Sequence, residues 1–416
     1  MISRKSHKEV NTMGSLEISI KIEFDQTQYK ANERQNLCFT MTNDSDKTVH
    51  VLKWHTPLEG FKSDMFRVEK DGEHAVYLGR EMKRGMPKPE DYVIIEPKGS
   101  ISANLNITEA YDIFEVGDYN VEFVSKLLDI GWEEPKALVS KLSAKREFIP
   151  KSVRSNVTSF KLLENREPRQ FKGVVKEKIA ELKTISEKVT PTFKNCSQTQ
   201  QNELNNALDE AVKIAREAKL VLSSTGEIKR PRSVHHKTWF GNYDNTRYNK
   251  AINDYDKIFD ALDNKSITFI CDCNENAYAY VYPTKPYEIY LCKQFWPAPL
   301  TGTDSKAGTI VHETSHFYVV AKTSDHVYGQ EGCKTLAINN PSEAIDNADS
   351  HEYFAENNPP LSNGDDCLPG DPVAQGQWSS IRDGHVLVSM RDGKVLDWVP
   401  ADGSWRLWNY DPAGIS

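Results

Sequence analysis

The chain has 416 residues, of which 27% are charged and 38% hydrophobic, and its formal net charge is −8. This length exceeds what one ordinary hydrophobic core accommodates and predicts two or three domains. The acidic balance argues against a nucleic-acid binder, which usually presents a basic surface, and no apolar run is long enough to predict a membrane span. The first ten residues include basic side chains but no apolar stretch, so no Sec signal peptide is visible.

The first half of the chain has the pattern of short β-strands. After a polar tail over residues 1–14, stretches such as 18–24 alternate apolar and polar residues and are separated by turn residues. We expect residues 15–150 to form an all-β sandwich of immunoglobulin-like type. A long basic loop at 79–92 interrupts these strands, and loops of that length are usually functional or disordered.

The region that follows changes to a mixed pattern. Residues 151–190 are rich in lysine and glutamate and are predicted to be a connector. From 191 to 360 the spacing of apolar residues predicts two helices and three short strands before a further apolar helix. The helices are expected at 204–222 and 246–262, and the strands at 267–271, 277–282 and 288–292. These elements together predict an α+β domain.

The last segment, residues 361–416, is predicted to be a small β unit. Asp-Gly pairs separate its apolar runs, and such pairs favour tight hairpins. Four of the eight tryptophans of the chain lie in this segment. We expect the unit to pack on another domain, and the alternative is a carbohydrate-binding or docking surface.

One motif in the α+β region carries chemistry. His312-Glu-Thr-Ser-His316 places two histidines four residues apart, so that both imidazoles share one helix face and can bind a single Zn²⁺. Glu313 can then act as a general base toward water. The alternative is an amphipathic helix with two surface histidines. Apolar flanks at 309–311 and 317–320 predict a buried helix instead, in which these polar groups need a partner such as a metal.

A third zinc ligand has to come from elsewhere in the chain. The metzincin spacing would need glycine at position 319 and histidine at position 322, where this chain has Val319 and Lys322. That spacing is therefore excluded, and the downstream carboxylates remain as candidates. They are Asp325, Glu331, Glu343, Asp346, Asp349, Glu352 and Glu356.

The motif and its surroundings resemble one family of peptidases. His312-Glu-x-x-His316 followed by Asp325 and Tyr328-Gly is similar to the aspzincins, the deuterolysin family, and within it most similar to the peptidyl-lysine metalloendopeptidases. The resemblance covers residues 191–360 and implies a zincin-type α+β fold. Its further motifs are Thr238–Gly241, Cys271–Cys273, Tyr280–Pro283, Thr301–Thr309 and Asn347–Asn358. Lys322 stands where relatives often have glycine, so we expect the tight turn before Asp325 to be relaxed.

The resemblance implies a role for each residue of the motif. His312, His316 and Asp325 would hold one Zn²⁺ per catalytic domain. Glu313 would serve as general base and then as proton donor, and Tyr328 would stabilise the oxyanion. The alternative for Tyr328 is a tyrosine that packs in the core.

The same resemblance implies a specificity for lysine. A buried ammonium needs a carboxylate partner, and Asp349 with Glu352 would line the pocket for a lysine that follows the cleaved bond. The implied substrates are proteins or peptides that contain lysine. The alternative for these two carboxylates is a solvated acidic helix end.

The resemblance also bears on the seven cysteines of the chain. It implies two disulfides, Cys196–Cys271 and Cys273–Cys292. Cys38, Cys333 and Cys367 are left unassigned. Disulfides imply an oxidising compartment, so we expect a secreted, extracellular protein although no signal peptide is visible.

Relatives of this family carry a β-rich propeptide, which predicts such a role for residues 15–150. We expect the protein to be made as a latent precursor, with Lys83 of the basic loop entering the lysine pocket as a substrate mimic. Two alternatives stay open. One is a deuterolysin-like endopeptidase without lysine preference, and the other is a toxin or effector protease whose segment 361–416 is a binding module.

Overall fold

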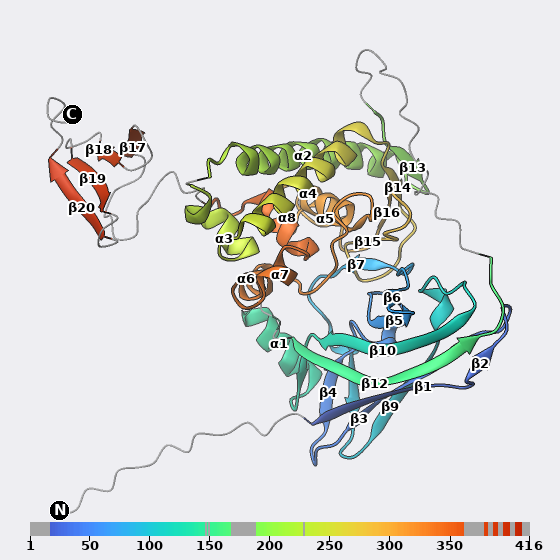
Figure 1. Ribbon diagram of the computed structural model, residues 1–416. Helices are drawn as coiled ribbons and strands as arrows, with labels where there is room; N and C mark the ends of the chain where they lie inside the picture. The colour runs from blue at the N-terminus through green and yellow to red at the C-terminus, as the bar shows by residue number, and fades with distance from the viewer. Residues whose placement is uncertain are drawn as a thin grey trace, which may run out of the picture. The chain divides into compact units, whose positions relative to one another are not determined.

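The computed structural model describes residues 17–145, 148, 150–167, 189–227, 229–361 and four strands between 378 and 409. The predicted tail at 1–14, residues 168–188 of the predicted connector, and Cys367 lie outside the described residues. The chain divides into two compact units, shown in Figure 1. The first comprises Met1–Gly79 and Met86–Gln170, and the second comprises Arg80–Gly85 and Phe171–Ser416.

The first unit is rich in β-structure, as the alternating pattern predicts. Its strands are β1 (Ile18–Phe24), β2 (Gln28–Tyr29), β3 (Asn36–Asn43), β4 (Val49–Leu52), β5 (Phe66–Lys70), β6 (Glu73–His74), β8 (Tyr92–Ile95), β9 (Ser100–Asn106), β10 (Gly117–Leu127), β11 (Ile130–Gly131) and β12 (Lys151–Leu162). They form three sheets, in the orders β1-β3-β9, β2-β12-β10-β5-β6 and β11-β4-β8. In β3 every second side chain is buried, including Leu37, Phe39 and Met41, because strand side chains alternate between two faces.

One helix of this unit, α1 (Pro135–Lys145), has no counterpart among the predicted elements. Proline at a first helical position and buried Leu138 and Leu142, four residues apart, are the signals for it. Both signals are short, which explains why the β pattern on either side hides them.

The second unit combines helices with one mixed sheet. Its helices are α2 (Gln198–Ser224), α3 (Val234–Phe240), α4 (Asn245–Asn264), α5 (Lys306–His316), α6 (Gln330–Asn339), α7 (Pro341–Ala344) and α8 (Ala348–Glu356). Its sheet has the order β13-β14-β16-β15-β7, from β13 (Thr192–Lys194), β14 (Thr268–Ile270), β16 (Glu288–Leu291), β15 (Ala279–Val281) and β7 (Glu81–Lys83). The two helices and three strands predicted from the spacing of apolar residues are all present.

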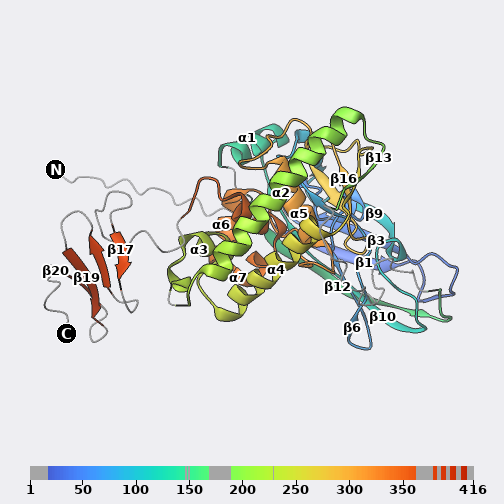
Figure 2. The same ribbon diagram turned by 90° about the horizontal axis from the view of Figure 1, so that it is seen from above.

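Helix α2 provides the long apolar surface on which this unit packs. Ser197 caps its first turn by accepting from the backbone of Gln200, and the Gln200 side chain accepts in return from Ser197. Buried Leu204, Leu208 and Ala211 share one face at helical spacing. Figure 2 shows α2 running across α4 and α5, which it contacts.

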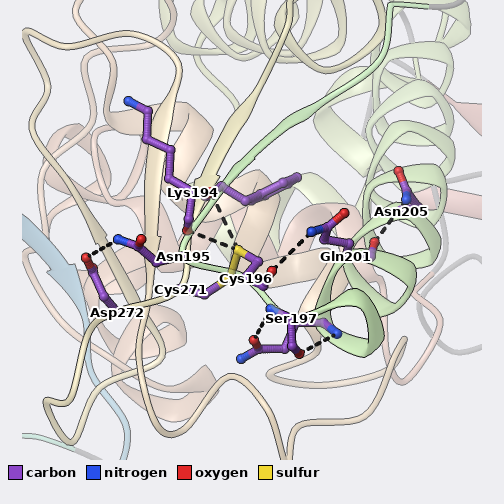
Figure 3. Close-up of a disulfide and its surroundings, with 10 residues drawn as sticks. Lys194, Asn195, Cys196, Ser197, Gln201, Asn205, Cys271 and Asp272 are labelled. Carbon is purple, nitrogen blue, oxygen red and sulfur yellow. Dashed lines mark hydrogen bonds between the residues drawn. A yellow bond between two sulfur atoms is a disulfide. The ribbon is translucent and has the colours of Figure 1, made fainter.

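Two disulfides fix the edge of this unit. Cys196 beside α2 is bonded to Cys271 after β14, and Cys273 is bonded to Cys292 after β16, the pairing that the resemblance implies. Figure 3 shows the first bond, with the Asn195 side chain donating to Asp272 next to it. These links tie the start of α2 and the rim of the sheet together. Among the described residues, Cys38 and Cys333 are free.

The last described strands form a sheet of their own. They are β17 (Trp378–Ile381), β18 (Val386–Ser389), β19 (Lys394–Val399) and β20 (Ser404–Asn409). Successive strands pair antiparallel in chain order, as expected from the Asp-Gly turns. Within the described part of the chain, no helix is both long and apolar enough to cross a membrane.

Helices α5 and α8 approach each other closely at Gly308. All residues of α5 are buried, and a Cβ added at Gly308 would lie 2.1 Å from Glu356 Oε1 and 3.0 Å from Glu352 Cγ. Glu356 is held in place because its Oε1 accepts from the backbone and hydroxyl of Ser305, the N-cap of α5, at 2.9 and 2.7 Å. The small residue therefore sets the distance between the two helices.

The turn after α5 is not relaxed, so the expectation drawn from Lys322 is wrong. Lys322 has a φ of +56°, in the left-handed region that favours glycine. The reason is the reversal of the chain at the helix end. Lys322 donates to the carbonyl of Phe317, and Thr323 donates to the carbonyl of Ser315, both at 3.2 Å. Lys322 therefore adopts the left-handed conformation that these two hydrogen bonds require.

Substitution of Gly308 tests the α5–α8 contact. We expect Gly308→Ala to lower the free energy of unfolding by about 1–3 kcal/mol, because the added methyl overlaps a fixed carboxylate. Denaturant unfolding of the full chain measures the change. The matched control is Gly332→Ala in α6, where the new Cβ would lie 3.6 Å from Val327, an ordinary contact. There a helical alanine is expected to stabilise slightly, and equal destabilisation by both substitutions would contradict the account.

Candidate functional site

Helix α5 and the turn after it bring three donor atoms together. His312 Nε2 lies 3.2 Å from His316 Nε2, and Asp325 Oδ1 lies 3.3 Å from the first and 3.6 Å from the second. All three side chains are buried. The i, i+4 spacing of the histidines accounts for their common face, and the turn at Lys322 directs Asp325 back toward them.

The spacing of these donors fits a zinc ion. Ligand bonds of about 2.0–2.1 Å in a tetrahedron place neighbouring donors about 3.3–3.4 Å apart, close to the three distances observed. Two imidazole nitrogens and one carboxylate oxygen form a set that leaves one tetrahedral position for water or substrate. The second nitrogen of each imidazole has a partner as well. His316 Nδ1 lies 2.8 Å from the Thr323 carbonyl, and His312 Nδ1 lies 2.9 Å from Asp349 Oδ1. The carbonyl contact places a proton on His316 Nδ1, and His312 Nδ1 lies at ion-pair distance from its carboxylate, while both Nε2 atoms belong to the candidate metal-binding set.

Glu313 lies beside this set in α5 and is fully buried. Burial raises the pKa of Glu313 to about 8, although the neighbouring His312 counteracts this. A carboxyl group with such a pKa can accept and release a proton near neutral pH. The arrangement therefore pairs a metal-binding set with a group suited to proton transfer.

The edge of the sheet in the second unit carries a strand from far earlier in the chain. β7 pairs antiparallel with β15, with Met82 opposite Tyr280 and Lys83 opposite Ala279. The Lys83 carbonyl also accepts from the Tyr278 backbone at 3.0 Å. Figure 1 shows β7 in blue next to β15. An extended segment added to a sheet edge is a common way in which proteins bind peptides.

The peptide unit after Met82 lies next to the donor set. The Met82 carbonyl accepts from the Tyr328 hydroxyl at 3.0 Å, and the Met82 amide donates to Asp325 Oδ2 at 3.1 Å. Tyr328 is buried, so its hydroxyl acts at close range on this carbonyl. The carbonyl of the Met82–Lys83 bond thus faces the neutral hydroxyl donor of Tyr328.

The Lys83 side chain ends in a cage of carboxylates. Its Nζ lies 2.6 Å from Glu352 Oε2, 3.2 Å from Asp304 Oδ1 and 3.5 Å from Asp349 Oδ1, and the side chain has no exposed surface. Burial alone lowers the pKa of Lys83, but Asp349, Glu352 and Asp304 outweigh it and hold the pKa well above its ordinary value. The ammonium therefore stays charged in a fully buried position.

Two aromatic rings complete this cage. Lys83 Nζ lies 5.1 Å from the centre of the Tyr278 ring and 5.7 Å from that of Tyr353. A cation near the face of an aromatic ring is attracted by the ring quadrupole. The pocket therefore combines carboxylates at its end with rings along its wall.

The structure places the sequence-predicted residues in one region. The predicted zinc ligands, Glu313, Tyr328, Asp349, Glu352 and Lys83 all lie there, while two other candidate carboxylates have separate partners. Glu331 pairs with Lys334 at 2.6 Å, and Asp346 pairs with His326 at 3.1 Å.

Asp304 was missed by sequence reasoning. It lies in the motif Thr301–Thr309, but nothing in that pattern gives it a role. Its Oδ1 accepts from the Tyr353 hydroxyl at 2.7 Å, which holds it toward the lysine.

Comparison with known proteins finds related peptidases. Residues 228–356 match a family model described as aspzincin, lysine-specific metallo-endopeptidase, and residues 152–281 match one described as a putative peptidase family. An extracellular protease of Aeromonas hydrophila is 39% identical over 320 residues, 77% of this chain and 87% of that protein. A peptidyl-Lys metalloendopeptidase of Pleurotus ostreatus is 45% identical over 172 residues, 41% of this chain and 99% of that protein. A solved zinc peptidase from Grifola frondosa is 40% identical and covers 40% of this chain and 100% of its own, with a TM-score of 0.38.

The relative from Aeromonas hydrophila matches along most of both chains, and the family model covers the helix that carries His312 and His316. The chain therefore belongs to the aspzincin family of zinc metallopeptidases and is a metalloendopeptidase.

Proposed function

We propose that the protein cleaves Xaa-Lys peptide bonds and that it is made as a latent precursor whose own segment Arg80–Gly85 occupies the substrate site. One observation carries the proposal. A buried lysine ammonium lies among three carboxylates, and the carbonyl just before that lysine accepts from Tyr328. The description of the matching family and the name of the Pleurotus ostreatus relative support lysine as the recognised residue.

The residues of the site would divide the reaction among them. His312, His316 and Asp325 would hold a zinc ion, which when bound would supply Lewis acidity toward the substrate carbonyl and water. Glu313 takes a proton from the attacking water as the water oxygen bonds to the carbonyl carbon. Tyr328 donates to the carbonyl oxygen as negative charge develops on it. Glu313 then delivers the proton to the departing amine nitrogen when the carbon–nitrogen bond breaks.

Charge would select the residue after the cleaved bond. Asp349 and Glu352 are fully buried, so a neutral side chain in the pocket would leave their charges without compensation. Leaving buried charges unpaired is costly, and such a site rejects a substrate that lacks the matching group. Lysine has both the length and the charge that the pocket requires.

Latency would follow from the same contacts. The segment around Lys83 runs antiparallel to β15 and fills the lysine pocket, so an incoming substrate has to displace it. We assign the propeptide to residues 15–150, as an immunoglobulin-like sandwich, followed by the connector 151–190. The first part of that connector is strand β12, which pairs with β10 and so extends the β-rich unit beyond residue 150. The zincin-type catalytic domain would be residues 191–360.

Two further features belong to this proposal. The disulfides and the Aeromonas hydrophila relative named as an extracellular protease support secretion. The β unit at 361–416 remains a candidate for carbohydrate or surface contact.

Metal removal and Glu313 substitution test the hydrolytic mechanism. We expect a chelator to abolish peptide hydrolysis by the active enzyme generated from the full-length chain, and added Zn²⁺ to restore it. Glu313→Gln should retain zinc but lose activity by about 10²–10⁴-fold, because proton transfer is removed. Glu331→Gln, an exposed substitution of the same type, is the control. Full activity of Glu313→Gln would contradict the assigned role.

A peptide library tests the lysine preference. We expect cleavage to occur before lysine, and Asp304→Asn to lower kcat/KM for such peptides by about 10-fold through loss of one charged contact. Asp304 does not contact His312 in any observed interaction, so the zinc content should stay unchanged. Asp349→Asn is the comparison, since Asp349 also contacts His312 and should affect both quantities. Cleavage without regard to lysine would instead favour a deuterolysin-like specificity.

Substitution of Lys83 tests latency. We expect full-length Lys83→Ala to hydrolyse a short peptide substrate at least about 10-fold faster than the uncut wild-type chain, because a fully buried charged contact is removed from the segment. Gel analysis must confirm that both chains are still intact during the assay. Lys88→Ala, an exposed lysine of the same loop, is the matched control. If Lys83→Ala stayed as inactive as the wild-type precursor, Lys83 would not be the inhibitory residue.

A further inference from the structure

A second positively charged side chain, that of Arg80, is bound near the lysine pocket. Arg80 lies three residues before Lys83 in the sequence. Arg80 Nη1 lies 2.8 Å from Glu275 Oε1, and the Arg80 guanidinium lies 4.8 Å from the centre of the Tyr280 ring. Both charged side chains are mostly covered, with 27% and 31% of their surfaces exposed. An arginine that combines a carboxylate with an aromatic face has the two contacts that its planar group favours.

The extended backbone around β7 determines where Arg80 lies relative to the Met82–Lys83 peptide bond. Along an extended segment, side chains alternate, so Arg80 and Met82 project to the same face. Met82 lies opposite Tyr280 and packs on Ala277 and Cys292, while the ring of Tyr280 also receives Arg80. One ring thus borders two successive positions of the bound segment on the same face.

The aromatic face is built into the sheet. Tyr280 stacks on Tyr290 of β16, with ring centres 4.5 Å apart and planes inclined by 8°. Tyr282 meets both rings edge-on, at 5.9 and 5.7 Å. Glu275 lies near one end of this face, and its backbone carbonyl accepts from Lys293. The two stacked tyrosines therefore belong to β15 and β16 and not to the segment that contains Arg80.

We infer that Glu275 and Tyr280 form a subsite for a basic residue at the third position before the lysine of the substrate. The inference rests on the proposed function, because the position is counted from the lysine in the pocket. A substrate that runs antiparallel to β15 as β7 does would place its third residue before lysine where Arg80 lies. The enzyme would then recognise two cations, with any two residues between them, and not lysine alone.

Peptides that differ only at this third position test the subsite. The active enzyme generated from the full-length chain is assayed on peptides with one lysine and with arginine, glutamine or glutamate three residues before it. We expect kcat/KM to be about five-fold higher for arginine than for glutamine, as a partly exposed ion pair and a cation–π contact imply. Glutamate should be the poorest of the three, because it faces Glu275. Arginine moved to the fourth position should lose the advantage.

Variants of the enzyme assign the preference to residues. Glu275→Gln should bring the arginine-to-glutamine ratio of kcat/KM toward one. Glu331→Gln, a substitution of the same type in α6 whose partner is Lys334, should leave the ratio at its wild-type value. Cleavage before lysine with no preference for arginine would overturn the subsite while the lysine proposal stands. Cleavage that ignores lysine would overturn both, because the register would be lost.

Discussion

The ion pairs of the buried Lys83 ammonium are the interactions on which the proposed lysine recognition and the proposed latency both depend. A charged amine without exposed surface is tolerated only because Asp304, Asp349 and Glu352 surround it. The same carboxylates would repel one another in an empty, dry pocket. The carboxylates and the ammonium therefore stabilise each other, and under the proposed function one arrangement would both bind a substrate tightly and hold a precursor inactive.

The lysine pocket and the metal-binding set share a carboxylate. Asp349 Oδ1 lies 2.9 Å from His312 Nδ1 and 3.5 Å from Lys83 Nζ, and its Oδ2 accepts from Gly329 at 2.8 Å. A carboxylate in this position would orient a proposed zinc ligand and would also interact electrostatically with any cation in the pocket. The close approach of α5 and α8 at Gly308 makes this sharing geometrically possible, since α5 carries His312 and α8 carries Asp349.

Local patterns in the sequence were enough to predict part of this site. The spacing of His312 and His316 determines a common helix face whatever surrounds it, and the alternation of strands such as β3 is equally local. Asp325 became a ligand candidate through proximity in sequence, and a resemblance selected it among several carboxylates. Asp349 and Glu352 also came from that resemblance, because nothing local shows that α8 faces α5.

Other parts depend on contacts between distant segments and were not predictable in this way. Asp304 joins the pocket only because Tyr353 holds it there, and Glu275 meets Arg80 across 195 positions of sequence. The conformation of Lys322 was predicted wrongly, because the helix end imposes it against the preference of the residue.

The burial of the Lys83 ammonium among carboxylates can be tested directly by amine-reactive labelling of the zinc-loaded full-length chain, read by mass spectrometry. We expect Lys83 to stay unlabelled while the exposed Lys88 reacts, and labelling of Lys83 as rapid as that of Lys88 would contradict its burial among the carboxylates.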